Sequence, residues 1–254
     1  MLKIESKKIK FTERDIAIFE FLSIYGYADF DALYMLTKNF FPCSKSTFKD
    51  RLNVLKSSGY LEIGKYNMPR NDKNNPNFEF TLVKGNNKAF SGIGGRRPNV
   101  KILKSNFYHE LFIIRTLAKL KENGDAAYSE KMDNYPFGDK EIRPDVYCPS
   151  LKYGFEVEVS IKRNWLEYRR KFAVLQEQLD DAKRNKKDPK IKKIICLVEK
   201  EKDKNLFAKK IENFKNKSVN AEQNFEKYLP NQTVNESFIA MTFNEFWSKK
   251  LDSI

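Results

Sequence analysis

The first third of the chain changes from helical to strand periodicity. Thr12 is a typical N-cap, and the apolar residues that follow it recur at helical spacing as far as Gly26. Two more helical patterns follow, and then two segments alternate between apolar and polar residues on either side of an Asn-rich stretch. The expected elements are helices over 12–26, 30–37 and 44–57 and strands over 60–64 and 78–82.

The remaining two thirds also alternate between helical and strand patterns. Leu111, Ile114 and Leu117 recur at helical spacing, and residues 193–198 form the short apolar run typical of a buried strand. The expected order is helix, three strands, helix, strand, which is typical of an α/β or α+β sandwich. The predicted helices cover 107–120, 165–179, 206–214 and 244–251, and the predicted strands cover 126–129, 142–147, 155–161, 193–198 and 238–242.

These patterns predict two domains. The first, residues 8–90, holds the three helices and the strand pair, and the second, residues 105–254, holds the α/β pattern. Between them, residues 91–104 contain a glycine cluster followed by Arg96 and Arg97, which is typical of a basic linker.

The charge of the chain indicates a polyanionic partner. Its 254 residues include 48 Lys and Arg against 34 Asp and Glu, a formal net charge of +14. Nucleic acid and an anionic membrane face are the leading candidates for such a partner. No stretch approaches the roughly 18 apolar residues of a membrane span, and the N-terminal residues lack the apolar run of a signal peptide. With three widely separated cysteines, these features predict a cytoplasmic protein.

The residue types that are scarce exclude several kinds of site. The chain has one histidine, His109, whereas a C2H2 finger, an H-E-x-x-H site and a His-cluster relaxase each need more. The P-loop pattern G-x-x-x-x-G-K-[ST] does not occur either. Catalysis would therefore depend mainly on carboxylates, lysines, tyrosines or serines.

The N-terminal pattern resembles a winged helix-turn-helix. Three helices precede a two-stranded hairpin, and the run from Leu52 to Leu61 is similar to the junction between recognition helix and wing in that family. In such folds the N-terminal half of the recognition helix meets base edges and phosphates of double-stranded DNA. The alternatives are a solvated helix face and a winged helix used for protein contacts. The expected DNA-binding residues are Lys45, Ser46, Thr47, Lys49 and Arg51, with Arg96 and Arg97 of the linker.

Residues 155–162 carry the chemistry of the second domain. Side chains alternate along a strand, so Glu156, Glu158 and Ser160 share one face while the apolar residues share the other. Two carboxylates on one face repel each other, and a divalent cation with Asp145 from the neighbouring strand would turn that repulsion into coordination. Bound Mg²⁺ or Mn²⁺ lowers the pKa of water and neutralises charge on a phosphodiester. The alternative is a half-exposed strand with solvated glutamates.

The spacing of these acidic residues resembles the PD-(D/E)xK nuclease superfamily. Pro144-Asp145 supplies the "PD" dipeptide, and Glu156-Val157-Glu158 follows about ten residues later. The resemblance implies that Asp145, Glu156 and Glu158 bind the metal. The chain departs from the family where Glu158 occupies the position usually held by lysine, and the expected substitute is Lys162 or Lys171.

The order of motifs is also similar to the replication-relaxation proteins and the MobC-type plasmid relaxases. A winged helix comes first, followed by a helix with His109-Glu110-Leu111 and then by the acidic motifs. The resemblance implies that His109 and Glu110 reach the site, as acid/base or as an outer ligand. The alternative for His109 is a capping or packing role.

These features predict a DNA-processing protein of a mobile element, which nicks one strand of DNA for plasmid mobilisation or replication initiation. Its expected partners are double-stranded DNA, single-stranded DNA at a nick, and a second copy or accessory mobilisation or replication proteins. Two alternatives stay open. One is a non-catalytic DNA-binding regulator with a degenerate nuclease-like domain, which the missing lysine favours. The other is the endonuclease subunit of a transposition or defence system.

Overall fold

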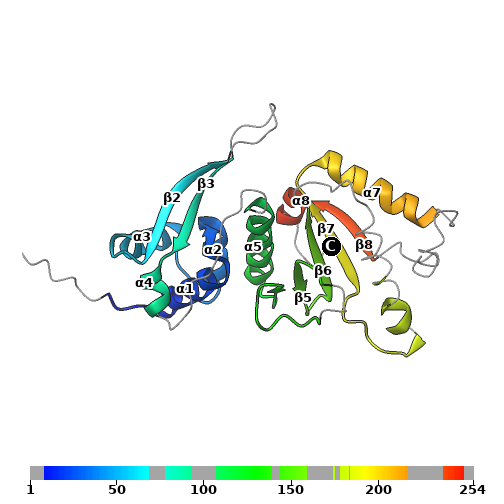
Figure 1. Cartoon of the computed structure of the whole chain (residues 1–254), viewed down its shortest axis with the longest axis horizontal. Helices are drawn as coiled ribbons and strands as arrows, with labels where there is room; N and C mark the ends of the chain where they lie inside the picture. The colour runs from blue at the N-terminus through cyan, green and yellow to red at the C-terminus, as the bar shows by residue number, and fades with distance from the viewer. Residues whose placement is uncertain are drawn as a thin grey trace, which may run out of the picture. The chain divides into compact units, whose positions relative to one another are not determined.

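The computed structural model divides the chain into two compact units, Met1–Leu103 and Lys104–Ile254 (Figure 1). The structure describes residues 9–68, 78–92, 107–138, 143–158, 174, 178–182, 184–216 and 237–248.

The first unit begins with three helices whose ends are fixed by local hydrogen bonds. Helix α1 (Glu13–Tyr25) has a capping box, in which the Thr12 hydroxyl accepts from the Asp15 N–H and the Asp15 carboxylate accepts from the Thr12 N–H. Gly26, at a φ of 78°, ends that helix in the left-handed conformation. Asp29 caps α2 (Phe30–Lys38), and Ser44 caps α3 (Lys45–Ser57) by accepting from the Thr47 N–H at 3.1 Å.

A three-stranded sheet completes this unit. Strands β2 (Leu61–Met68) and β3 (Phe78–Gly85) pair as an antiparallel hairpin, and β1 (Tyr27–Asp29) pairs with the other side of β3. The short helix α4 (Asn87–Gly92) follows the hairpin. The core of the unit consists of fully buried apolar side chains, among them Phe19, Leu22, Leu33, Phe48, Leu55 and Val83.

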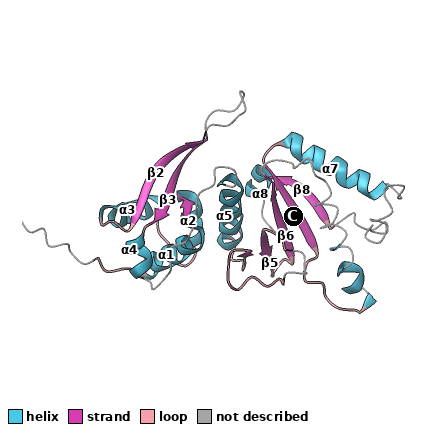
Figure 2. Ribbon diagram, viewed as in Figure 1, coloured by secondary structure: helices cyan, strands magenta, loops and turns pink. Residues whose placement is uncertain are grey.

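The second unit is built on a five-stranded sheet in the order β4-β5-β6-β7-β8 (Figure 2). The first three strands are antiparallel and the last three are parallel. As a result, the carboxyl ends of β6, β7 and β8 meet at one edge, where Glu158, Val198 and Thr242 stand in register. The strands are β4 (Tyr128–Ser129), β5 (Val146–Cys148), β6 (Tyr153–Glu158), β7 (Lys193–Val198) and β8 (Phe238–Thr242), and the helices are α5 (Phe107–Glu122), α7 (Glu201–Asn216) and α8 (Phe243–Ser248).

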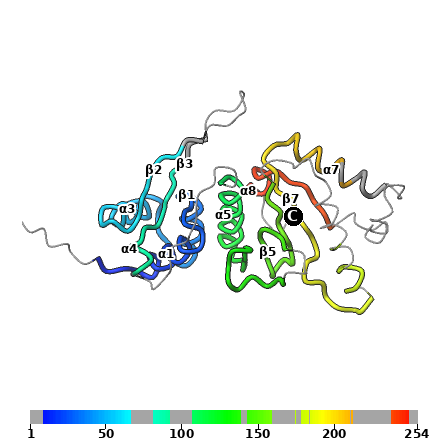
Figure 3. Tube along the Cα trace, viewed as in Figure 1, coloured from blue at the N-terminus to red at the C-terminus, as the bar shows by residue number. Residues whose placement is uncertain are grey.

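Helices cover both faces of this sheet. On one face, Ile194 and Cys196 of β7 pack with Phe207 of α7 in a buried apolar cluster. On the other face, the ring of Phe155 packs against that of Phe246 in α8, with ring centroids 5.4 Å apart. Helix α5 joins α8 on this face through stacked aromatic rings, and Figures 1 and 3 show α5 and α7 on opposite sides of the sheet. Both faces of β6 and β7 are therefore buried.

The expected mixed α/β class is confirmed, and the sequence patterns located most of the elements. Two short elements, β1 and α4, were not predicted. The long helix over 165–179 lies mostly outside the described residues, as do the basic linker and its Arg96 and Arg97. Within the described residues, no helix combines the length and apolar character that a membrane crossing requires.

Candidate functional site

Asp145 lies where β5 begins, beside the carboxyl end of β6. Because β5 runs antiparallel to β6 with Val146 opposite Phe155, the preceding residue Asp145 is placed next to Glu156. Its Oδ2 accepts a hydrogen bond from the backbone N–H of Val157 at 2.8 Å. The Asp145 side chain retains 17% exposure, so its carboxylate is both fixed by the sheet and open to solvent.

Glu156 occupies the centre of β6 and is only 2% exposed. Its position is paired with Cys196 in β7, which belongs to the apolar cluster under α7. The alternative of a half-exposed strand with solvated glutamates therefore does not hold for Glu156. Burying a carboxylate is expensive unless charge or hydrogen bonding compensates for it, so its retention in the sheet points to a polar role.

His109 of α5 contacts the carboxylate of Asp145. Its Nε2 lies 3.3 Å from Oδ2 of Asp145, so two residues that were expected at the site lie in contact. Burial alone would lower the pKa of His109. The hydrogen bond and charge of Asp145, with the charges of Glu158 and Glu156, outweigh burial and raise that pKa above its usual value. The imidazole therefore interacts electrostatically with all three predicted metal ligands.

The three predicted metal ligands do not form a preformed metal-binding site in this structure. In the part of the chain that the structure describes, no group of three or more His, Cys, Asp or Glu side chains is placed to hold one metal ion. Glu158 is two residues beyond Glu156, which separates the two by roughly 6.6 Å along the strand.

The donor chemistry at Asp145 and Glu156 nevertheless fits a hard divalent cation. Carboxylate oxygens suit Mg²⁺ and Mn²⁺ alike, and Mg²⁺ is commonly held by one or two carboxylates with water and substrate phosphate in the other positions. Asp145 is held at the edge of β6 and Glu156 is buried next to it. These two residues would hold the ion.

Glu110 is held differently from its neighbour His109. Its Oε1 lies 2.6 Å from Nζ of Lys131, a residue in the turn after β4. Glu130 in the same turn pairs with Arg143, with 3.3 Å between the Glu130 carboxylate and the guanidinium. Lys131 belongs to no sequence motif and was not predicted. Arg143, by contrast, directly precedes Pro144-Asp145. Its position next to the motif could have indicated that it lies near the site.

Tyr135 joins this network from the segment between β4 and β5. Its hydroxyl donates to the carbonyl oxygen of Pro144, the residue before Asp145. Burial, and then the charge of Glu156, raise the pKa of Tyr135 well above its usual value. The hydroxyl is therefore a hydrogen-bond donor that steadies the backbone leading into Asp145.

The first unit presents most of its predicted DNA-binding residues to solvent. Lys45, Ser46, Thr47 and Lys49 of α3 are all exposed, while Phe48 faces the core. Lys45 forms an exposed ion pair with Asp31 at 2.9 Å, a contact of the kind that contributes little to stability. These side chains are accessible to a ligand.

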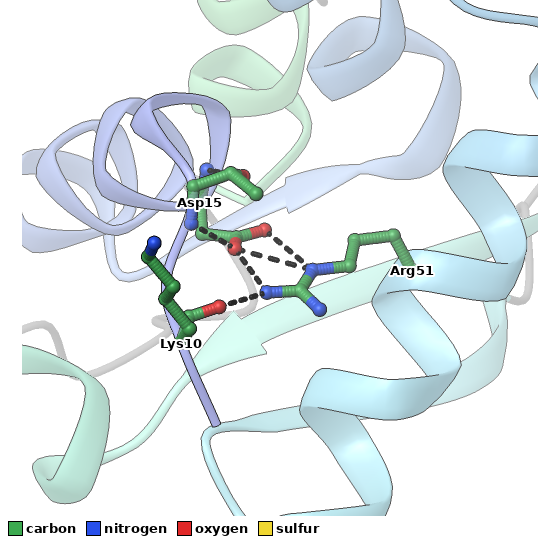
Figure 4. Close-up of polar contacts among 4 residues, drawn as sticks. Lys10, Asp15 and Arg51 are labelled. Carbon is green, nitrogen blue, oxygen red and sulfur yellow. Dashed lines mark hydrogen bonds and ion pairs between the residues drawn. The ribbon is translucent and has the colours of Figure 1, made fainter. Parts of the chain in front are cut away.

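Arg51 differs from the other residues predicted to bind DNA. Its guanidinium donates to both carboxylate oxygens of Asp15 and to the carbonyl oxygen of Lys10 (Figure 4). The Asp15 side chain is completely buried. The structure thus directs Arg51 inward to join α3 to α1, because position 51 lies close to the buried face of the helix defined by Phe48, Leu52 and Leu55.

Lys162 and Lys171, the two expected substitutes for the missing motif lysine, lie outside the described residues, as do Arg96 and Arg97. No protein-family model, curated protein or solved structure matches the chain.

Proposed function

We propose that this chain is a DNA-processing protein of a mobile element that binds double-stranded DNA through a winged helix and nicks one strand with a divalent metal. Such an activity would suit plasmid mobilisation or replication initiation. On this proposal the first unit is the winged helix-turn-helix and the second unit is a nuclease-like domain of the PD-(D/E)xK kind.

One observation carries the proposal. Asp145, just before β5, contacts His109 of α5 and accepts a hydrogen bond from the Val157 N–H of β6. The register of β5 with β6 sets Asp145 beside the position of Glu156, close to the edge where the parallel strands end. Ligands of α/β sheets commonly bind beyond the carboxyl ends of parallel strands. A purely structural sheet edge has no need of a buried glutamate beside an aspartate that also contacts the chain's single histidine.

The residues divide the chemistry between them. Asp145, held by the Val157 N–H, and the buried Glu156 would hold the cation. When bound, that ion would stabilise the charge that develops on the phosphodiester and lower the pKa of an attacking water. His109 would hold or release a proton at Nε2, the atom that now contacts Asp145. The Tyr135 hydroxyl would keep the backbone before Asp145 in place through the Pro144 carbonyl.

The first unit supplies the features expected of a DNA-binding module. Three capped helices precede an antiparallel hairpin, which is the element order of a winged helix. The exposed N-terminal half of α3 carries Lys45 and Lys49, and the whole chain carries a net charge of +14.

The proposal is tested by incubating the full-length protein with supercoiled plasmid that includes DNA from beside its gene, in Mg²⁺, Mn²⁺ or EDTA. The wild-type protein is expected to form open circles only with metal. Glu156→Gln removes a ligand charge at nearly constant size and should abolish nicking while leaving DNA affinity nearly unchanged.

Asp188→Asn is the matched control. Asp188 is an exposed carboxylate paired with Lys152, and Lys152 precedes β6, at the opposite end of that strand from Glu158. This variant should nick like the wild type. Nicking by Glu156→Gln at the wild-type rate would remove the assignment of the site.

A second candidate function is a DNA-binding regulator without nuclease activity. The specific observation in its favour is Glu158, which puts a carboxylate where the family pattern has a lysine. On this alternative the plasmid stays supercoiled in every metal while the protein still binds that DNA in a salt-sensitive manner. Linear product instead of open circles would favour an endonuclease that cuts both strands.

A further inference from the structure

Two cationic side chains lie beside the carboxylates of the second unit. Lys131 is in the turn after β4, and its Nζ lies 2.6 Å from Glu110, the residue next to His109 on α5. Arg143 is two residues before Asp145, and its guanidinium lies 3.3 Å from Glu130, the residue next to Lys131. The turn at 130–131 therefore connects the end of α5 that carries His109 with the segment that carries Asp145.

The electrostatic contacts place Arg143 close to the buried part of the site. Its guanidinium lies over the ring of Tyr135, 5.7 Å from the ring centroid. The pKa of Tyr135 responds to charge on Glu156, Glu130, Arg143 and Asp145 together. Arg143 and both carboxylates that are proposed to hold the metal therefore lie around Tyr135.

Among the residues that the structure describes, the acidic side chains outnumber the cations here, which is unfavourable for a DNA strand. Five carboxylates lie on the segments that meet here, and one of them, Glu158, stands at the motif position that usually supplies a lysine. The five are those of Glu110, Glu130, Asp145, Glu156 and Glu158. A bound divalent cation offsets only part of it. Nearby cations are needed before a phosphate can approach such a surface.

Lys131 and Arg143 are accessible enough to meet this need. Their side chains are 39% and 34% exposed, and their partners Glu110 and Glu130 are 19% and 54% exposed. Ion pairs that are partly solvated contribute little to stability, so a phosphate can replace a glutamate as the partner. Arginine is especially suited to this exchange because its planar fork matches phosphate with two parallel hydrogen bonds.

We propose that Lys131 and Arg143 bind the backbone phosphates of the DNA strand at the Asp145–Glu156 site. This inference rests on the proposed function and names the residues that supply the cationic charge for which the motif has no lysine. Glu110 and Glu130 hold the two cations beside the carboxylates until DNA replaces them. These two residues therefore contact the phosphate backbone of the DNA and do not distinguish one base from another.

The first test measures nicking of supercoiled plasmid by full-length Lys131→Met and Arg143→Gln. Each variant should slow nicking on the order of 10²-fold, because the DNA strand loses a contact that positions it at the carboxylates. Lys131→Arg, which keeps the charge, should recover most of the rate. Lys192→Met removes an exposed lysine of the second unit that pairs with Asp188, and should nick at the wild-type rate.

The second test measures DNA affinity against salt concentration for the same variants, each combined with Glu156→Gln so that the DNA stays intact. Loss of one phosphate contact should reduce the slope of log affinity against log salt by about 0.9 for each cation removed. Thermal unfolding of each variant establishes that it is folded.

The outcomes separate this inference from the proposed function. Wild-type nicking together with unimpaired nicking by folded Lys131→Met and Arg143→Gln would overturn the inference and leave the proposed function standing. A wild-type protein that never nicks would refute the proposed function. In that case an unchanged salt slope in both variants overturns the phosphate contacts as well, and a reduced slope supports them as DNA-binding contacts.

Discussion

At the scale of single residues, Asp15 and Asp145 show how surroundings assign roles to two carboxylates. Asp15 is completely buried and accepts hydrogen bonds from Arg51 and Thr12, so its bonding capacity is used within the first unit. Asp145 is partly exposed and accepts from Val157 while contacting His109. The first arrangement stabilises a fold, whereas the second leaves a carboxylate available to a ligand.

Asp15→Asn should destabilise the first unit strongly. The substitution leaves the Arg51 guanidinium, which is itself mostly buried, without its charged partner. Removing one member of a buried ion pair typically costs about 3–5 kcal/mol. Denaturant unfolding measures this loss, and Asp31→Asn is the control because its ion pair with Lys45 is exposed and should change stability little. Equal losses in the two variants would contradict the structural role of Asp15.

The same pair gives a pH dependence with a definite sign. Burial alone would raise the pKa of Asp15, but the hydrogen bonds from Arg51 and Thr12 outweigh it and lower that pKa below its usual range. The contribution to stability is therefore complete above the unfolded pKa of about 3.9 and is lost as the pH falls through the lower, folded value. The difference in unfolding free energy between wild type and Asp15→Asn should shrink below about pH 4.

At the scale of secondary-structure elements, periodicity predicted most of the fold. The predicted N-cap Thr12 begins α1, and α3 begins at Lys45, next to Ser44, where the third helix was expected to start. The apolar run at 193–198 is β7. Strand β1 was not predicted because its three residues follow Gly26 directly and are too few to show a period. The same lack of pattern explains why α4, with six residues, was missed.

The candidate site could be predicted only in part. Alternation along residues 155–162 indicated that Glu156 and Glu158 share a face, but only the parallel pairing of β6 with β7 reveals that Glu156 is buried. Likewise, the exposed flank of α3 was predicted, whereas the inward direction of Arg51 depends on Asp15, which is 36 residues away. Contacts between distant segments leave no periodic signal in a single sequence.

Strand β6 offers a test of how the sheet positions Asp145. A Cβ added to Gly154 would lie 3.0 Å from Cβ of Pro144, closer than carbon atoms normally approach. Gly154→Ala should therefore displace Pro144 and the adjacent Asp145 and slow nicking roughly tenfold. Gly64→Ala in β2 is the control, because a Cβ there would meet nothing within 4 Å. Plasmid nicking by Gly154→Ala at the wild-type rate would show that Asp145 tolerates this displacement.

At the scale of the whole molecule, the two units carry complementary features of one proposed activity. The first has exposed lysines at the start of α3. The second has Asp145 held against β6, with two cations on the segments beside it. A net charge of +14 favours association with a polyanion, and that association should weaken steeply as salt rises. On the proposed function, substitutions in α3 and substitutions at the carboxylates Asp145 and Glu156 should therefore separate DNA binding from chemistry.

The most direct test of the central claim is single-turnover nicking of plasmid at saturating protein, comparing wild type with Asp145→Asn in Mg²⁺. Saturation removes differences in affinity, so the rate reports the carboxylate site alone. We predict that the wild type forms open circles and that Asp145→Asn forms none while it still binds the DNA. Equal rates for the two proteins would contradict the assignment of the Asp145–Glu156 site.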